Sequence, residues 1–236
     1  MKKNIYFKII PMGIIKDIFT KSKNIWEMLL VKDTYLGKIK SRSSGKIDKS
    51  VILKNNVNIG SNTIIEPFCV IEGPIYIGKN CYIRPHCFIR PRTIIGDNVT
   101  IGHGVEVKNS IIMDECKLDS HSFVGDSIFG VGVRNGSATI TANRRFDQKD
   151  IKIKYKDCKF DTGFDKFGCI IGDYTRLGAN CTVGPGTLIG QHVWIYPNIF
   201  IRGFIPGNTL VKLKQDLKLS SKEKMVLKKY DKLNNR

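Results

Sequence analysis

Residues 142–168 hold the densest group of side chains that could bind or transform a charged substrate. The group is cationic apart from one amide: Asn143, Arg144, Arg145, Lys149, Lys152, Lys154, Lys156 and Lys159. Ammonium and guanidinium groups form charge-assisted hydrogen bonds with phosphate oxygens. The cluster therefore predicts a site for a phosphate-bearing ligand, and a solvated charged loop is the alternative interpretation.

An aliphatic residue recurs every six positions in the segment before this cluster. The series is Ile47, Leu53, Ile59, Ile65, Ile71, Ile77, Ile83, Ile89, Ile95, Ile101 and Val107. A second small or apolar residue follows each member four positions later. Neither the alternation of a strand nor the 3.6-residue stripe of a helix has this spacing. With single-residue contractions the series continues to Asn135, stops, and returns from Ile171 to Ile201.

A six-residue repeat predicts a prism with three flat faces, in which each hexad supplies one short strand and one corner and three hexads complete a coil. Successive coils stack at the strand spacing of about 4.8 Å, and the two recurring positions of each hexad point inward. Gly and Asn after many aliphatic positions suit the tight corners. The expected fold class is all-β, a parallel β-helix.

The same register accounts for the cysteines. Six of the seven occupy the second inward position, and only Cys158 lies outside the pattern. No Cys-x-x-Cys is present, so we expect small core residues and no metal or redox site.

Two segments flank the repeat. Apolar clusters in residues 1–46 predict short helices packing near the first coil. Ser220 with Glu223 forms a capping box that predicts a C-terminal helix. The expected organisation is a helical segment at 1–46, a β-helix at 47–205 with an inserted loop at 142–168, and a basic helical segment at 206–236. We expect the terminal helices to cap the open ends of the prism.

The net charge of +18 comes mainly from these flanks. Lys and Arg outnumber Asp and Glu by 11 to 3 in residues 1–46, by 19 to 15 in 47–205 and by 9 to 3 in 206–236. No nucleic-acid-binding motif accompanies the charge, so no nucleic-acid partner is expected. The sequence has no apolar stretch of roughly 20 residues and no signal peptide, which predicts a cytoplasmic protein without a membrane span.

Several motifs resemble those of one enzyme family. They are FVGDS at 123–127, NGSATITANRRFD at 135–147, EGPIYIGKN from Glu72, VEVKNSIIMD from Val105 and FIPGN from Phe204. These are similar to the acetyltransferase half of bifunctional sugar-1-phosphate nucleotidyltransferase/glucosamine-1-phosphate N-acetyltransferases. The resemblance implies a left-handed β-helix, against the usual right-handed crossover. It also implies a homotrimer with its active site between neighbouring prisms, which transfers acetyl from acetyl-CoA to glucosamine-1-phosphate or galactosamine-1-phosphate.

The resemblance assigns roles to individual residues. Asn143 matches a catalytic Asn, whose amide can orient the substrate or polarise a carbonyl, while Lys149 and Lys152 match lysines that hold a phosphate or stabilise an oxyanion. The residues expected to bind the substrate are Ser120, Phe123, Arg144, Lys149 and Lys152. The residues expected to line the groove for acetyl-CoA, a co-substrate, are Ser137, Ala138, Cys169 and Ala179. No metal is required.

The family's His-x-x-Tyr motif is replaced by Ser120 and Phe123, so the usual general base is missing. His103 is the first candidate replacement, because its hexad should stack one coil before that of Ser120 on the same face. His121 is the second candidate, because neighbouring residues of a strand face opposite ways. Ala138 stands where the family has Gly, which adds a methyl group to the coenzyme groove.

The sequence therefore predicts an acetyl-CoA-dependent N-acetyltransferase for an amino sugar phosphate, in nucleotide-sugar or cell-envelope polysaccharide synthesis. A catalytically inactive trimeric scaffold or regulatory relative is the alternative, because the family His and Tyr are missing. Since 46 residues cannot hold the nucleotidyltransferase domain, a separate nucleotidyltransferase is an expected partner. A carbonic-anhydrase-like prism would need three histidine ligands, and four scattered histidines give it little support.

Overall fold

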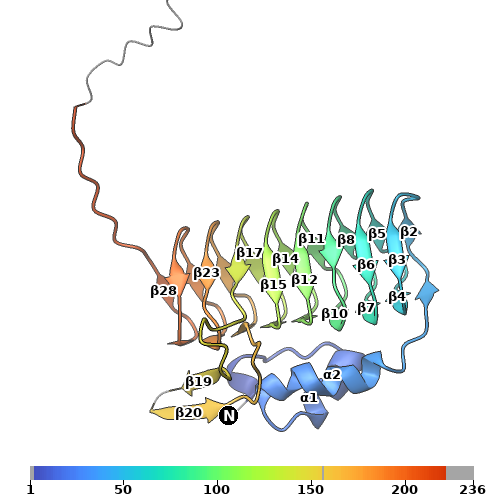
Figure 1. Cartoon of the computed structure of the whole chain (residues 1–236), viewed down its shortest axis with the longest axis horizontal. Helices are drawn as coiled ribbons and strands as arrows, with labels where there is room; N and C mark the ends of the chain where they lie inside the picture. Colours follow the sequence, from blue (N-terminus) through green and yellow to red (C-terminus); the bar gives the residue numbers. More distant parts are fainter. Residues whose placement is uncertain (1–2, 156, 222–236) are drawn as a thin grey trace, which may run out of the picture.

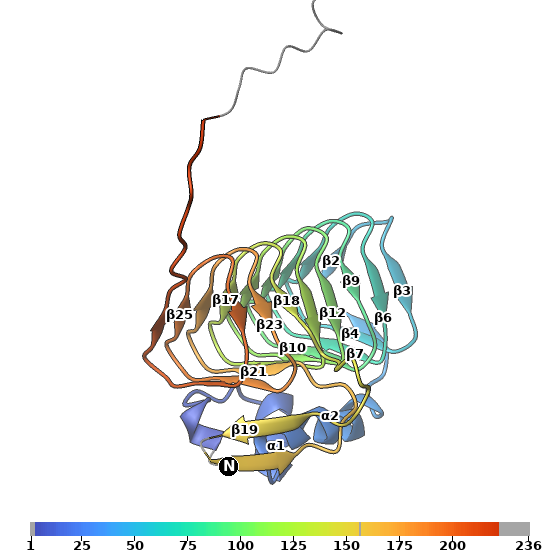
Figure 2. The same cartoon turned by 60° about the vertical axis from the view of Figure 1, so that its left-hand side comes forward.

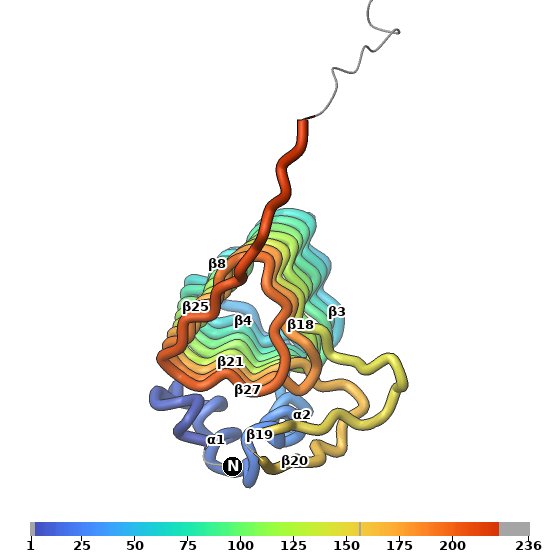
Figure 3. The backbone as a smooth tube through the Cα atoms, turned by 90° about the vertical axis from the view of Figure 1, so that its left-hand side faces the viewer, coloured from blue at the N-terminus to red at the C-terminus, as the bar shows by residue number. Residues whose placement is uncertain are grey.

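The repeat region folds as a left-handed parallel β-helix with a triangular cross-section (Figure 3), as the sequence predicts. The structure is a computed structural model that describes residues 3–155 and 157–221. Seen from the side, the coils stack into a row that runs from the strands near the N-terminus to those near the C-terminus (Figure 1).

Three sheets form the faces of the prism, each built from strands one coil apart. Sheet A contains β1 (Arg42–Ser43), β4 (Val57–Ile59), β7 (Ile75–Ile77), β10 (Thr93–Ile95), β13 (Ile111–Ile112), β16 (Ile128–Phe129), β21 (Cys169–Ile171), β24 (Thr187–Ile189) and β27 (Phe204–Ile205). Sheet B contains β2 (Lys46–Ile47), β5 (Ile64–Ile65), β8 (Tyr82–Ile83), β11 (Thr100–Ile101), β14 (Lys117–Leu118), β17 (Arg134–Asn135), β22 (Arg176–Leu177), β25 (Trp194–Ile195) and β28 (Leu210–Val211). Sheet C contains β3 (Ile52–Lys54), β6 (Val70–Glu72), β9 (Phe88–Ile89), β12 (Glu106–Lys108), β15 (Phe123–Gly125), β18 (Ile140–Thr141), β23 (Thr182–Val183) and β26 (Phe200–Ile201).

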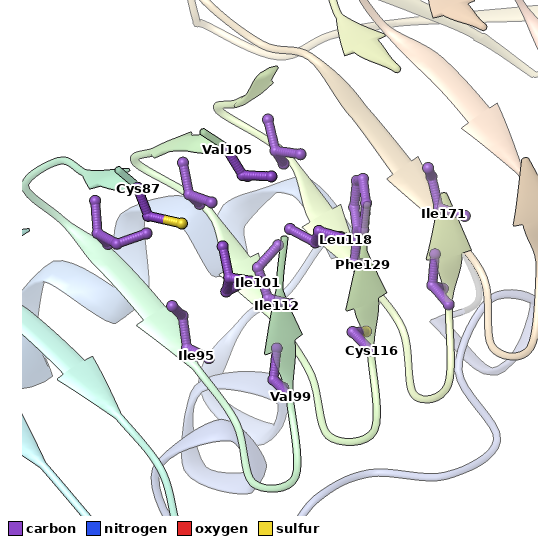
Figure 4. Close-up of a cluster of buried hydrophobic side chains, with 14 of the residues drawn as sticks. Cys87, Ile95, Val99, Ile101, Val105, Ile112, Cys116, Leu118, Phe129 and Ile171 are labelled. Carbon is purple, nitrogen blue, oxygen red and sulfur yellow. The ribbon is translucent and has the colours of Figure 1, made fainter. Parts of the chain in front are cut away.

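The register of the sheets follows the 18-residue coil. Ile77 pairs with Ile59 on one side and with Ile95 on the other. All three side chains are buried in the interior of the prism, which confirms the predicted inward positions. Figure 4 shows this packing around Ile95 and Ile112. Six cysteines are buried and Cys158 is exposed, as the register predicts.

The N-terminal helices lie along the outer face of sheet A. They are η1 (Lys3–Ile5), α1 (Ile14–Lys21), η2 (Ile25–Glu27) and α2 (Met28–Leu36). An antiparallel hairpin of β19 (Lys152–Tyr155) and β20 (Cys158–Asp161) lies beside them (Figure 2). The hairpin belongs to the inserted segment. In the part of the chain that the structure describes, no helix has the length and apolarity needed to cross a membrane.

The expectation that the N-terminal helices cap an open end is wrong. Sheet A turns Ile94, Ile111 and Ile128 outward, and all three are buried against the helices and the hairpin in a second apolar cluster. Burying an aliphatic side chain contributes about 1.5–3 kcal/mol, so this face has to be covered. The sheets also run past both predicted ends of the β-helix, from Arg42 to Val211. The predicted C-terminal helix falls on residues 222–236, which lie outside the described residues.

Candidate active site

A cleft of about 1320 Å³ lies between the inserted segment and the last coils of sheet C. Its cationic lining residues are Arg144, Arg145, Lys152, Lys154, Lys159 and Arg202. Its aromatic lining residues are Phe146, Phe200 and Phe204. Asp147 is the acidic lining residue, and its pKa is lowered to about 2 by a hydrogen bond from Arg145. The cleft therefore suits an anionic ligand that also presents apolar surface.

Asn143 does not itself line this cleft, but its chain neighbours Ala142 and Arg144 do. Figure 3 shows the inserted segment leaving the prism here, next to β18. The Asn143 Nδ2 atom donates a hydrogen bond to Asp126 Oδ2. A Cβ added at Gly125 would lie 2.9 Å from Asn143 Nδ2 and 2.7 Å from Phe123 Cζ, so these two side chains share one small patch at the end of β15.

The opposite end of β15 meets the corner between sheets B and C. The predicted stacking of His103 with Ser120 is confirmed by the register, because Ile101 pairs with Leu118 two positions before them. At the same corner His121 N donates to His103 O at 2.9 Å, and Ala138 N donates to Ser120 O at 2.9 Å. The same backbone ladder continues from Ser137 O to the N–H of Asn180, which follows Ala179. This corner therefore holds six of the predicted site residues: His103, Ser120, His121, Ser137, Ala138 and Ala179.

The rings of His103 and His121 lie 5.1 Å apart, edge to face. His121 is a corner residue with φ of 58°, so the strand alternation used in the prediction does not apply to it. It is exposed and faces His103. Phe68 and His86 extend the same column, with ring separations of 5.2 Å between Phe68 and His86 and 5.3 Å between His86 and His103.

Cys169 does not line a groove with its side chain. It is fully buried inside the prism, its Sγ lies 3.7 Å from Ser127 Oγ, and burial raises its pKa to about 12. The residue occupies the inward position of its hexad, as the register predicts, so only its backbone could contribute to a coenzyme groove. Lys149 is exposed but outside the cleft, whereas Lys152 lines the cleft from β19.

Within one chain the predicted site residues form two separate groups. Four residue steps along the chain lead from His121 to Gly125, which is at most about 13 Å of backbone. In a single chain the His103–His121 corner and the Asn143 patch therefore lie at opposite ends of β15. In the described part of the chain, no group of three or more His, Cys, Asp and Glu side chains could hold a metal ion.

Sequence reasoning missed Asp126, Arg202, Phe200 and Lys32. Asp126 lies within the FVGDS motif, and Arg202 and Phe200 flank the inward Ile201 and therefore face outward. The sequence therefore contains signals that could have identified these three residues. Lys32 gave no signal, because its burial depends on how α2 docks on sheet A.

The comparisons with known proteins identify the family of this chain. The model of the GMPPB C-terminal domain matches residues 71–158. The bifunctional protein GlmU of Methanococcus aeolicus is 37% identical over 199 residues, which cover 84% of this chain and 48% of that protein. The chain thus spans about half the length of this relative. A bifunctional sugar-1-phosphate nucleotidylyltransferase/acetyltransferase of Sulfurisphaera tokodaii is 41% identical over 97 residues, 41% of this chain and 24% of that protein.

One relative is matched over most of its length. The uncharacterized acetyltransferase YaiX of Escherichia coli O6:K15:H31 is 36% identical over 171 residues, which cover 72% of this chain and 73% of YaiX. The chain therefore belongs to the left-handed β-helix acetyltransferase family of YaiX and the matching part of the GlmU proteins, and the resemblance seen in the sequence is confirmed.

Proposed function

We propose that this protein is an acyltransferase that moves acetyl from acetyl-CoA to the amine of an amino sugar phosphate such as glucosamine-1-phosphate. The observation that carries the proposal is the cationic cleft beside Asn143 in a member of an acetyltransferase family. The name of the Sulfurisphaera relative, which pairs an acetyltransferase with sugar-1-phosphate chemistry, supports the substrate class.

The proposed reaction forms one C–N bond and breaks one C–S bond. The substrate amine attacks the thioester carbonyl, a base takes a proton from the nitrogen, and the departing thiolate is protonated. Lys152, Lys154 and Arg144 would hold phosphate oxygens through charge-assisted hydrogen bonds. His103 and His121 are the candidate bases, and proton transfer of this kind contributes typically 10²- to 10⁴-fold in rate.

The proposal includes a homotrimer. The His103–His121 corner and the Asn143 patch lie at opposite ends of β15, and a second copy would supply one of the two groups to a shared groove. Ser137, Ala138 and Ala179 would then line that groove for the coenzyme. Light scattering at micromolar concentration is expected to give three times the chain mass of 26.7 kDa, and a monomer would contradict both the assembly and the shared site.

The direct test is to mix the pure chain with acetyl-CoA and glucosamine-1-phosphate and to measure released thiol and the acetylated sugar by mass spectrometry. Glucosamine, which lacks the phosphate, should react far more slowly, and N-acetylglucosamine-1-phosphate, whose amine is blocked, should not react. The product would be a substrate for a nucleotidyltransferase in the cytoplasm.

The alternative, an inactive scaffold or regulatory relative, is favoured by one observation. Phe123 lies beside Asn143 without the hydroxyl of a tyrosine, and Ser120 cannot replace a histidine base unaided. Calorimetric titration with acetyl-CoA separates the two functions, because an inactive scaffold has no need to bind the coenzyme.

A further inference from the structure

A buried chain of hydrogen bonds connects α2 to Asn143. Lys32 is fully buried, and its Nζ donates to Asn109 Oδ1 at 2.7 Å, to Leu29 O at 2.9 Å and to Asp33 Oδ1 at 3.1 Å. Asn109 Nδ2 donates in turn to Asp126 Oδ1 at 2.5 Å, and Asn143 Nδ2 donates to Asp126 Oδ2. Asn109 and Asp126 are corner residues of consecutive coils, with φ of 47° and 49°.

The donors and acceptors in this chain of hydrogen bonds fix the orientation of both Asn side chains. An ammonium group has donors only, so Asn109 has to turn its oxygen to Lys32 and its NH₂ group to Asp126. An ionised carboxylate has acceptors only, so Asn143 has to turn its NH₂ group to Asp126. The remaining atom, Asn143 Oδ1, accepts no hydrogen bond from any residue in the described ranges 3–155 and 157–221.

We propose that Lys32, Asn109 and Asp126 form a positioning chain that presents Asn143 Oδ1 as the hydrogen-bond acceptor for the amine of the acceptor sugar. This inference rests on the proposed function. Of the two roles open to an Asn amide, it selects orientation of the nucleophile, because Asp126 holds one N–H of the NH₂ group on its own side and leaves Oδ1 as the unpaired acceptor. An amine held through one N–H keeps its lone pair available for the thioester carbon.

Anchoring of α2 alone does not explain a buried lysine. Met28, Leu29 and Leu36 of α2 are already buried against sheet A, and Asp33 of the same helix pairs with Arg92 of the β-helix. Burying an ammonium costs free energy that a well-packed apolar side chain would not. Burial accordingly lowers the pKa of Lys32 to about 8. The burial of Lys32 is explained by its effect on Asn109, whose side-chain oxygen it holds toward α2.

The first variant is Asp126→Asn, which keeps the shape of the side chain and suits the left-handed corner. Lys32 keeps the NH₂ group of Asn109 turned to position 126, so the oxygen stays on that side. The new NH₂ group then faces Asn143 and Lys108, whose Nζ lies 3.5 Å from Asp126 Oδ2, and it forces the Asn143 amide to flip. We expect kcat with glucosamine-1-phosphate to fall about 10- to 100-fold, equivalent to roughly 1.4–2.7 kcal/mol, while KM for acetyl-CoA stays unchanged. The double variant Asp126→Asn/Asn143→Asp restores an outward acceptor and should recover at least tenfold in kcat.

Lys32→Met removes the first donor without touching Asp126 or Asn143. It should lower kcat in the wild-type background and have no further effect in the Asn143→Ala background, since both changes act through one amide. Arg92→Gln is the matched control, because it removes the other polar contact of α2 and leaves the chain intact. If Lys32→Met lowers kcat equally in both backgrounds, the hydrogen-bond chain only anchors α2, and the proposal is wrong.

A readout without catalysis separates this inference from the proposed function. The side-chain NH₂ protons of Asn143, assigned by their loss in Asn143→Ala, should exchange slowly in the wild type at pH 7 and faster in Lys32→Met. If no acetyl transfer is found but the slow exchange of the Asn143 NH₂ protons depends on Lys32, the proposed function is wrong. The conclusion that the hydrogen-bond chain orients Asn143 is then still supported. If transfer is found and Lys32→Met changes neither kcat nor exchange, the positioning chain is wrong and the function stands.

Discussion

The Oδ2 atom of Asp173 lies 2.7 Å from the backbone nitrogen of Lys8, across 165 residues of sequence. The same carboxylate accepts the N–H of Ile9 at 3.1 Å and the N–H of Val131 at 2.9 Å, and Asp173 is 1% exposed. One buried side chain therefore ties the N-terminal segment to the corner between sheets A and B.

Asp173→Asn should destabilise the fold despite its unchanged shape. Either orientation of the amide sets an NH₂ group against backbone N–H donors, so at least one of them loses its partner. The expected loss in the free energy of unfolding is about 1–3 kcal/mol, measured by urea denaturation. Asp119→Asn, at an exposed corner, is the control and should change stability by less than about 0.5 kcal/mol. Equal effects of the two variants would contradict the anchoring role.

The interior of the prism could be predicted from the sequence because the six-residue period is a local property of the chain. Ile77 and Ile95 point inward whatever surrounds the prism. The covering of sheet A could not be predicted in this way, because it depends on outward residues such as Ile94, which look like any other strand residue until their face is known. Lys32 shows the same limit, since a lysine on a helix is expected in solvent and its burial follows from long-range docking.

The same distinction between local pattern and long-range packing applies to the candidate site. The stacking of His103 on Ser120 follows from counting hexads and is confirmed. The groove position of Cys169, by contrast, comes from matching motifs and stays a prediction, which only the backbone of this buried residue could fulfil. Asn143 could be singled out from the motif, but its hydrogen bond to Asp126 could not, because the two residues are 17 positions apart and meet only when consecutive coils stack.

Ala138→Gly should stabilise the protein. Ala138 has φ of 57°, a left-handed conformation that costs an L-residue with a side chain roughly 1–2 kcal/mol. Glycine avoids this strain but gains conformational freedom in the unfolded chain, worth about 0.4–1 kcal/mol. The net expectation is a gain of about 0.5–1 kcal/mol in the free energy of unfolding, measured by urea denaturation. A loss of stability would mean that the methyl group makes contacts that outweigh the strain.

The stability should rise with pH in alkaline solution through Lys32. Burial lowers the pKa of Lys32 from 10.5 to about 8 in the folded chain. Between these values the unfolded chain binds more protons, so the free energy of unfolding increases with pH. Relative to Lys32→Met, the wild type should gain about 1–3 kcal/mol from pH 7.5 to pH 10. Lys38→Met, at an exposed position of the same segment, should leave this slope as in the wild type.

Lys152 should matter more than Lys149 for binding the sugar phosphate. Lys152 lines the cationic cleft, whereas Lys149 lies outside it. We expect Lys152→Ala to raise KM for glucosamine-1-phosphate about 5- to 20-fold with little change in kcat, as for the loss of one charge-assisted hydrogen bond. Lys149→Ala should raise KM less, and the difference should shrink in 0.5 M salt because exposed charges are screened. A larger effect for Lys149 would place the phosphate outside the cleft.

The last prediction concerns the base. His103 and His121 lie 5.1 Å apart on the corner that carries Ser120, so one imidazole can take over when the other is removed. Each single alanine variant should therefore lose kcat only partly, while His103→Ala/His121→Ala should lose 10²- to 10⁴-fold at pH 7. His86→Ala, one coil further along the same aromatic column, is the matched control and should retain kcat. If the double variant keeps full kcat with glucosamine-1-phosphate while Asn143→Ala loses it, no base acts at this corner, and catalysis comes from positioning alone.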